Sequence, residues 1–429
     1  MNPLRPIAQA VRAQGRERSR LPLHEQLPPP SDPLPLVGPP SQETPPALQE
    51  KDLQRWRLVE RFQEAVAEQV KKQGGLTGTW ADPNRQLQLG NYLGLFLFGL
   101  LNPVVKTMRG LCEASDFERV QREVCGRKVS LGSFSEAQAV VDPQLLKGVF
   151  EQLKAEADLP APKAYLRGTE RVIDSTVWQV LPRMTWAFWR RQGGLDNAVR
   201  LHLEFDLQTG QVHQGKLTKA KKCERQQWRE SAQPGTCNIG DRYYSYDYKQ
   251  LRDLQAKGTD FVVRLRLNAQ WVEENREVLT AEDRVAGVRW AGTVRLGKAG
   301  DGPRVRVVQL LGEDESILLA TSLPATDFPP EWIAHCYKHR WEVEMFFRWL
   351  KCILGCRHWL AESEQGVAVQ VYLALIAAQL LVLYRGERPN RRQMEAIQLY
   401  LMGWVSVAEL LAKLQPAAAA KKGAAVQKS

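Results

Sequence analysis

Three carboxylates in this sequence occupy positions from which they could do metal-assisted chemistry. Asp174 closes the apolar run RVID and Asp241 follows the run CNIG, so both are predicted at strand ends. A carboxylate at a strand end is held rigidly and can bind Mg²⁺, because hard divalent cations prefer oxygen ligands. Glu344 lies in the predicted helix WIAHCYKHRWEVEMFFRWLK. Taken alone, an Asp followed by Ser175 and Thr176 is more often a turn or a helix cap.

The predicted helix around Glu344 carries a stripe of functional side chains, which are Tyr337, Arg340, Glu344 and Lys351. At about 100° per residue, spacings of 3, 4 and 7 residues keep all four on one face of a single helix. Such a face suits a metal-bound phosphodiester, because the carboxylate can hold the metal while the cations grip phosphate oxygens. The alternative is a solvated stripe in which Arg340 and Glu344, four residues apart, simply pair.

Together these residues resemble the Asp-Asp-Glu transposases of the insertion-sequence-four family. The pattern Tyr337-x2-Arg340-x3-Glu344-x6-Lys351 matches the family signature without a gap, and the resemblance extends over roughly residues 130–385. It implies an α/β fold with a ribonuclease-H-like catalytic core interrupted by a β-strand insertion and preceded by a small all-helical domain. It also implies roles for the residues. Asp174, Asp241 and Glu344 would be the catalytic and metal-binding groups for two Mg²⁺ ions, with Mn²⁺ as a substitute, and Tyr337, Arg340 and Lys351 would bind DNA phosphate.

The function implied by this resemblance is Mg²⁺-dependent DNA cleavage and strand transfer, the cut-and-paste transposition of an insertion sequence by two-metal chemistry. The expected partner is double-stranded DNA, both the inverted-repeat ends of the element and the target. A dimer in the DNA complex, a bacterial cytoplasmic location and association with the nucleoid when DNA is bound are also expected. The alternatives are a catalytically silent, sequence-specific DNA-binding protein of transposase ancestry and another nuclease on the same core.

The interval between Asp241 and Glu344 is 103 positions, which is more than one core needs. Family members place a β-stranded insertion there, and some insert a tryptophan from it to hold a flipped base. The corresponding position in this sequence is Ile317. Trp271 and Trp290 are possible substitutes, although either is equally compatible with a place in the core.

The remaining elements must position these residues. Residues 1–50 contain twelve of the 25 prolines and are predicted to be a disordered lead-in. A helical domain is expected over 51–165, with Asp142 as N-cap and Pro143 at the first position of its last helix. This domain could bind DNA or serve equally well in packing or dimerisation. The ribonuclease-H-like core is expected over 166–268 and, with the C-terminal helices, over 321–415, with the β insertion at 269–320 and a disordered basic tail at 416–429.

The composition excludes several classes of protein. The 429 residues carry 59 Lys plus Arg against 48 Asp plus Glu, a net charge of +11 that permits an anionic partner. With 44% hydrophobic and 25% charged residues, the chain is neither collagenous nor wholly disordered. Seven cysteines are too few, and odd in number, for a disulfide framework. Cys336, Cys352 and Cys356 match no usual zinc spacing and are predicted to be buried thiols.

One apolar segment, from Gly366 to Tyr384, is just long enough to cross a bilayer. Gln370 and Gln379 interrupt it, and no other stretch of the chain resembles it. We therefore predict a buried helix packed on the sheet and no membrane partner.

Overall fold

The computed structural model describes residues 57–102, 104–105, 107–156, 166–167, 169–191, 194–312, 316–352, 359–385, 391–401 and 404–414. The disordered lead-in predicted over 1–50 and the basic tail predicted over 416–429 lie outside these residues.

The N-terminal described part is helical. Its helices are α3 (Arg57–Lys72), α4 (Leu89–Leu101), α5 (Met108–Ala114), α6 (Glu118–Val120), α7 (Leu131–Val140) and α8 (Pro143–Glu156), with short turns η1 (Gly78–Ala81) and η2 (Gln121–Cys125). Their core contains the rings of Tyr92, Phe96 and Phe134, whose centroids lie 5.0–6.1 Å apart. As predicted, α8 begins at Pro143, and the Asp142 carboxylate accepts the backbone N–H of Gln144 at 2.9 Å.

A mixed sheet forms the centre of the described chain. Its strands are β1 (Glu170–Gln179), β2 (Phe188–Arg191), β3 (Gly194–Asp206), β4 (Gln211–Lys219), β5 (Cys237–Gly240), β6 (Asp260–Arg264), β7 (Trp271–Arg276), β8 (Val288–Leu296), β9 (Arg304–Leu310) and β10 (Ile317–Thr321). The order is β2-β3-β1-β5-β6-β10-β9-β8-β7, with β4 paired to β3. Strands β1, β5 and β6 are parallel, and the other pairs are antiparallel. The predicted α/β class is therefore confirmed.

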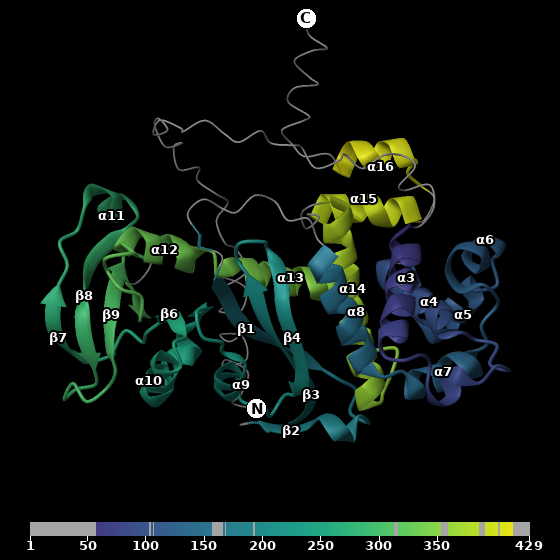
Figure 1. The fold of residues 1–429 in the computed structure, drawn as a ribbon, viewed down its shortest axis with the longest axis horizontal. Helices are drawn as coiled ribbons and strands as arrows, with labels where there is room; N and C mark the ends of the chain where they lie inside the picture. Colours follow the sequence, from purple (N-terminus) through teal and green to yellow (C-terminus); the bar gives the residue numbers. More distant parts are fainter. Residues whose placement is uncertain are drawn as a thin grey trace, which may run out of the picture. The chain divides into compact units, whose positions relative to one another are not determined.

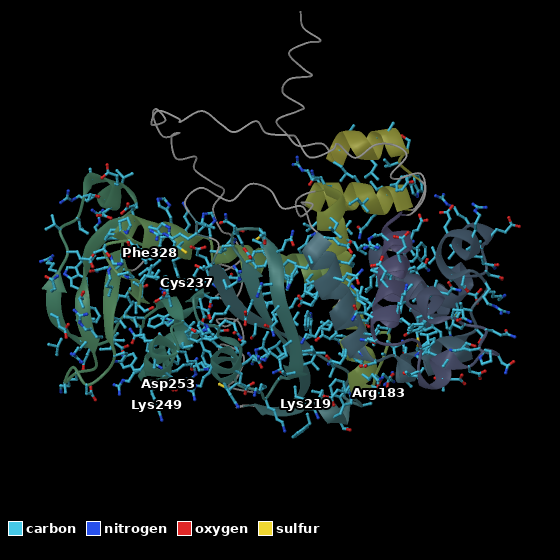
Figure 2. The ribbon with its side chains drawn as sticks, viewed as in Figure 1. Arg183, Lys219, Cys237, Lys249, Asp253 and Phe328 are labelled. Atoms are coloured by element: carbon cyan, nitrogen blue, oxygen red, sulfur yellow. The ribbon has the colours of Figure 1, made fainter. Side chains whose placement is uncertain are left out.

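Helices cover both faces of the sheet, as the alternation of side chains along a strand requires. On β6, Phe261 and Val263 belong to a core beneath α9 (Glu224–Ser231) and α10 (Tyr248–Ala256). Val262, between them, belongs to the opposite core beneath α12 (Pro330–Lys338), α13 (Trp341–Cys352) and α14 (Glu364–Arg385). Figure 1 shows α14 between the central strands and the N-terminal helices. In Figure 2, Lys249 and Asp253 project from the outer side of α10.

The strands between Asp241 and Glu344 extend the central sheet. Strand β10 pairs with β6, and β9, β8 and β7 follow it outward. Three further helices lie in this part of the chain and at its end. Helix α11 (Ala281–Val285) lies before β8, and α15 (Arg391–Leu401) and α16 (Val407–Leu414) follow α14. The added strands contribute to both cores, since Val294 and Val307 pack on one side and Ala291 and Val308 on the other.

The apolar segment predicted to be a buried helix is α14. Residues Glu364–Leu383 are long and apolar enough to cross a membrane, but 89% of that window is buried inside the protein. The two glutamines that interrupt the apolar segment bond within the protein: Gln370 accepts the backbone N–H of Leu360 at 3.0 Å, and Gln379 donates to the Gln211 side chain at 3.1 Å. The prediction of a buried core helix is confirmed.

The predicted single helix around Glu344 is wrong, because a turn at His339 and Arg340 divides it into α12 and α13. The N–H of Arg340 bonds to the Tyr337 carbonyl, and the N–H of Val343 bonds to the Arg340 carbonyl. These bonds span three residues instead of four, so the backbone is wound more tightly and the later residues are rotated relative to the earlier ones.

A carboxyl pair joins the added strands to α12. Asp283, which is fully buried, forms a capping box with Thr280 at the start of α11 and accepts the backbone N–H of Glu331 at 2.9 Å. One oxygen of Glu331 is buried without a hydrogen-bond partner. Burial and the neighbouring Asp283 carboxyl raise the pKa of Glu331 to about 7.

We expect Glu331→Gln to raise the melting temperature at about pH 8 and to change it little below about pH 5. The folded protein holds the Glu331 proton more tightly than the unfolded chain, so this group's stabilisation is present at low pH and is lost as pH rises through about 7. Thermal denaturation across this range measures the effect. The matched control is Glu273→Gln, on an exposed residue of β7. A pH-independent difference would contradict the assignment.

Candidate active site

The parallel register of β1 and β5 brings Asp174 and Asp241 side by side. Val172 on β1 is aligned with Ile239 on β5. Asp174 follows Val172 by two residues, and Asp241 follows Ile239 by two residues. Asp241 starts the turn η4 (Arg242–Ser245) and accepts the backbone N–H of Tyr243 at 2.8 Å. The two acids predicted at separate positions therefore share one edge of the parallel strands.

Asp174 lies within β1, so its predicted place at a strand end is wrong. Strand β1 continues to Gln179 because it pairs along this whole length with β3, where Asp174 faces Leu203 in register. On its other side, β5 stops at Gly240. The Asp174 carboxylate is thus fixed by a continuous strand and still lies where the neighbouring strand has ended.

Arg340 connects Glu344 to Asp174. One guanidinium nitrogen lies 3.8 Å from Asp174 Oδ2, and another lies 2.5 Å from Glu344 Oε1. The same guanidinium lies 5.8 Å from the centre of the Tyr337 ring. The Arg340–Glu344 pair predicted as an alternative does form, but it also includes Asp174. Although the helix is divided, the structure brings Tyr337, Arg340 and Glu344 to one place.

Lys351 lies apart from this group. Seven residues after Glu344 on α13, it is displaced by about 10 Å along the helix axis. Its ammonium donates to the Val177 carbonyl at 3.3 Å and lies 5.6 Å from the Trp178 ring. The stripe predicted from the sequence therefore runs along β1, with Arg340 beside Asp174 and Lys351 beside Val177.

The electrostatics of the site are those of an acidic centre with one close cation. Burial raises the pKa of Asp174 to about 6; the Ser175 N–H and Arg340 oppose that rise, while the Asp241 and Glu344 carboxylates add to it. Burial also raises the pKa of the Tyr337 hydroxyl. Within the described residues, no three His, Cys, Asp or Glu side chains converge closely enough to bind one metal ion as they stand. Arg340 occupies the space between two of the candidate ligands.

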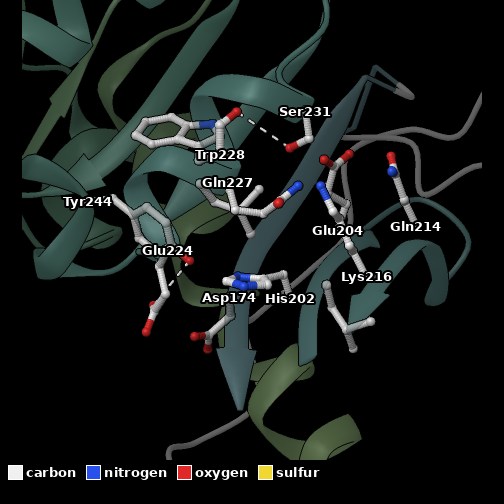
Figure 3. A pocket seen from close by; sticks show the side chains of 12 residues that line it. Asp174, His202, Glu204, Gln214, Lys216, Glu224, Gln227, Trp228, Ser231 and Tyr244 are labelled. Carbon is white, nitrogen blue, oxygen red and sulfur yellow. Dashed lines mark hydrogen bonds between the residues drawn. The ribbon is translucent and has the colours of Figure 1, made fainter. Parts of the chain in front are cut away.

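A half-buried ion pair beside Asp174 was not predicted from the sequence. Arg200 on β3 pairs with Glu224 at the start of α9 and donates to Ser175 Oγ at 2.9 Å. Figure 3 shows Glu224, Tyr244 and Asp174 around the pocket that this pair borders. The pattern VRLHLEF could have predicted it, because charged and polar residues alternate there with apolar ones. The polar residues therefore share one face of β3, and other parts of the protein cover that face.

Arg264 is a second residue without a role in the sequence-based prediction. It ends β6, one residue beyond the pair formed by Gly240 and Val263, so the register places it beside Asp241. Its charge lowers the pKa of Tyr337, opposing the effect of burial. Arg264 therefore adds a cation on the side of the site opposite to β3.

The described cysteine and the two tryptophans considered in the sequence analysis pack within the protein core or against it. Cys336 is fully buried, as predicted, whereas the side chains of Cys352 and Cys356 lie outside the described residues. The rings of Trp271 and Trp290 stack 6.2 Å apart and pack against the core beneath α9 and α10. The two tryptophans are thus half-buried packing residues in this structure.

Comparison with known proteins assigns the chain to a family. The model of the family described as "Transposase DDE domain" matches residues 166–380, half of the chain and all of the carboxylates above. The chain belongs to this family, which confirms the resemblance to the insertion-sequence-four transposases that the sequence indicated.

Three relatives illustrate the similarity. The predicted transposase y4zB of Sinorhizobium fredii is 29% identical over 221 residues, which cover 50% of this chain and 60% of the relative. The predicted transposase of element IS4SA from Synechocystis is 22% identical over 273 residues, covering 60% and 72%. The transposase of IS421 from Escherichia coli is 24% identical over 235 residues, covering 44% and 61%. The chain thus spans less than two thirds of the length of two of these relatives.

A solved structure is also similar in arrangement. The piggyBac transposase in a synaptic complex with hairpin DNA aligns over 84% of this chain and 83% of its own, with a TM-score of 0.40 and 10% identity.

We expect Arg200→Met to reduce the free energy of unfolding by about 2 kcal/mol, because it leaves the half-buried Glu224 without its cation. The double variant Arg200→Met/Glu224→Gln is expected to recover at least half of that loss, since it removes both charges. Urea unfolding measures both. Arg289→Met, on an exposed residue of β8, is the matched control. Equal losses in the single and double variants would contradict the pairing.

Proposed function

We propose that this chain is a transposase that cleaves DNA and transfers strands to a target. The observation that carries the proposal is the placement of Asp174 and Glu344 around one guanidinium, with Asp241 beside Asp174 at the edge where parallel strand β5 ends. Family membership supports it. In this proposal β4, β3, β1, β5 and β6 form the ribonuclease-H-like core, and β7–β10 are the insertion, with the domain limits predicted from the sequence.

The donor set fits divalent cations. Its three acids offer only oxygen ligands, which Mg²⁺ and Mn²⁺ prefer. Asp174, Asp241 and Glu344 would hold two such ions, which supply an activated oxygen nucleophile and stabilisation of the leaving oxygen. Arg340 now contributes the positive charge between two of these acids.

The cationic side chains would orient the DNA strand. If Asp174 and Glu344 bind metal ions, Arg340 can donate two parallel hydrogen bonds to a phosphate instead. Tyr337, whose pKa is raised by burial, stays protonated and can donate its hydroxyl to the same group. Lys351 lies further along β1 and would bind another phosphate of the strand.

The partners proposed for this reaction are the double-stranded ends of the element and the target DNA. The helical part, residues 57–156 of the described chain, is the proposed DNA-end-binding domain. Joining two ends requires two active sites, so we propose a dimer in the DNA complex. The site of action is the DNA of a bacterial cytoplasm.

We expect Asp174→Asn, Asp241→Asn and Glu344→Gln each to abolish Mg²⁺-dependent cleavage and strand transfer, because each removes one oxygen charge from the metal site. The assay uses duplex DNA with the inverted repeats that flank the gene, with products separated by electrophoresis. Glu342→Gln, two residues from Glu344 and hydrogen-bonded to His339 at 2.7 Å, should retain activity. Binding of these ends by wild type without any cleavage would instead support a silent DNA-binding protein.

We also expect Mg²⁺ to raise the melting temperature of the wild-type protein by a few degrees, because a ligand that binds only the folded state stabilises it. The shift should be lost in Asp241→Asn and kept in Glu342→Gln. Thermal denaturation with and without Mg²⁺, in the absence of DNA, measures it. A shift of equal size in Asp241→Asn would contradict metal binding by these acids.

A further inference from the structure

A cluster of aromatic and cationic side chains, exposed except for the half-buried Arg225, lies next to Asp241. We call it the tyrosine–arginine surface; its members are Arg225, Arg242, Tyr243, Tyr246 and Arg266. The guanidinium of Arg225 lies 5.0 Å from the centre of the Tyr243 ring, and that of Arg266 lies 3.6 Å from the Tyr246 ring. The two tyrosine rings are 5.7 Å apart. The surface therefore alternates cation, ring, ring and cation.

This surface is not accounted for by packing or by ion pairing. Tyr243 and Tyr246 are 36% and 42% exposed, while the adjacent Tyr244 is buried. Among the described residues, Arg225, Arg242 and Arg266 form no ion pair with a carboxylate. By contrast, Lys216 and Lys222 on the same side of the sheet both pair with Glu230. The positive charge of the surface is thus available to an anionic ligand.

A groove continues from Tyr246. It is lined by Tyr246, Tyr248, Arg266, Asn268, Gln270 and Lys298, among others. Tyr246 follows η4, Tyr248 begins α10, and the others come from the segment after β6 and the turn after β8. Asn268, Gln270 and Lys298 are exposed. The groove therefore combines two aromatic rings, two amides and two cations.

The surface is joined directly to the proposed cleavage site. Asp241 accepts the backbone N–H of Tyr243, whose ring contacts Tyr246. The segments after β5 and β6 both leave the carboxyl ends of parallel strands, and this is the edge at which open α/β sheets bind ligands. A DNA strand held at Asp241 would reach this surface within a few nucleotides.

The chemistry of the surface selects an unpaired nucleotide. A base in a duplex has both faces covered by its neighbours, so an exposed ring or guanidinium plane can stack only on a base that has left the helix. The amide side chains can hydrogen-bond to the edge of such a base, and the cations can bind its phosphates. A duplex backbone alone would use the arginines and leave the tyrosine rings without a role.

We propose that the tyrosine–arginine surface binds unpaired nucleotides of the DNA next to the cleaved phosphodiester, with Tyr246 and Arg266 stacking on a base. The proposal rests on the proposed function, because it places the ligand by the carboxylate at which the strand is cut. It adds a single-stranded binding site to that function.

The test is binding, measured by fluorescence polarisation in EDTA so that no cleavage occurs. The probes are a short duplex, the same duplex with a two-nucleotide unpaired end, and an oligo-thymidine single strand. For Tyr246→Ala we expect about tenfold weaker binding of the single strand and of the unpaired-end duplex, with little change for the blunt duplex. Tyr246→Phe should bind like wild type, because it keeps the ring.

Phe188→Ala is the matched control, since Phe188 is 49% exposed on β2, at the other end of the sheet. In a second measurement, 2-aminopurine at the unpaired position should be quenched by wild type and by Tyr246→Phe but not by Tyr246→Ala. Equal weakening of all three probes, or none, would overturn the proposal. Because cleavage of the inverted-repeat DNA is scored separately, loss of the proposed function and loss of this site are distinguishable.

Discussion

The parallel pairing of β1 with β5 is the constraint on which the rest of the site depends. It aligns Val172 with Ile239 and thereby places two carboxylates, 67 positions apart in the sequence, at neighbouring points of one sheet edge. Parallel neighbours need a crossover connection, and here the connection contains β3, β4 and α9. Strand β3 fixes β1 from its other side, and α9 carries the Glu224 that pairs with Arg200.

Clustering of acids is tolerated because cations and hydrogen bonds surround them. Arg340 contacts Asp174 and Glu344, Arg200 holds the Ser175 hydroxyl, and the backbone N–H groups of Ser175 and Tyr243 each donate to an aspartate. A buried carboxylate without such partners would be protonated instead.

The strands between Asp241 and Glu344 extend the sheet without separating the acids in space. Strand β10 pairs with β6, so the edge of the parallel strands is covered and not left open to other chains. Alternate side chains of β8 and β9 then extend both cores beyond the parallel strands. The chain returns through α12 to Glu344, so the long interval does not separate the acids in space.

Several features were determined by the sequence itself. The acids, the spacing of the Tyr337–Lys351 signature, the Asp142 cap and the apolar composition of α14 are local properties, expressed in residue types and in periods of a helix or strand. For the same reason the α/β class and the family could be inferred. The glutamines within α14 indicated a helix buried in the protein and not in a bilayer, because their amide groups need hydrogen-bond partners.

The tertiary structure decided everything that depends on register and on approach between distant segments. Continuation of β1 past Asp174 follows from pairing with β3, and the break at His339 and Arg340 follows from how α12 and α13 pack on the sheet. Placement of Arg340 between two acids, of Arg200 against Glu224, and of Tyr246 beneath Arg266 requires residues from separate strands and helices. Local periodicity contains no information on such contacts, because they are set by the long-range pairing of strands whose partners lie tens of residues away.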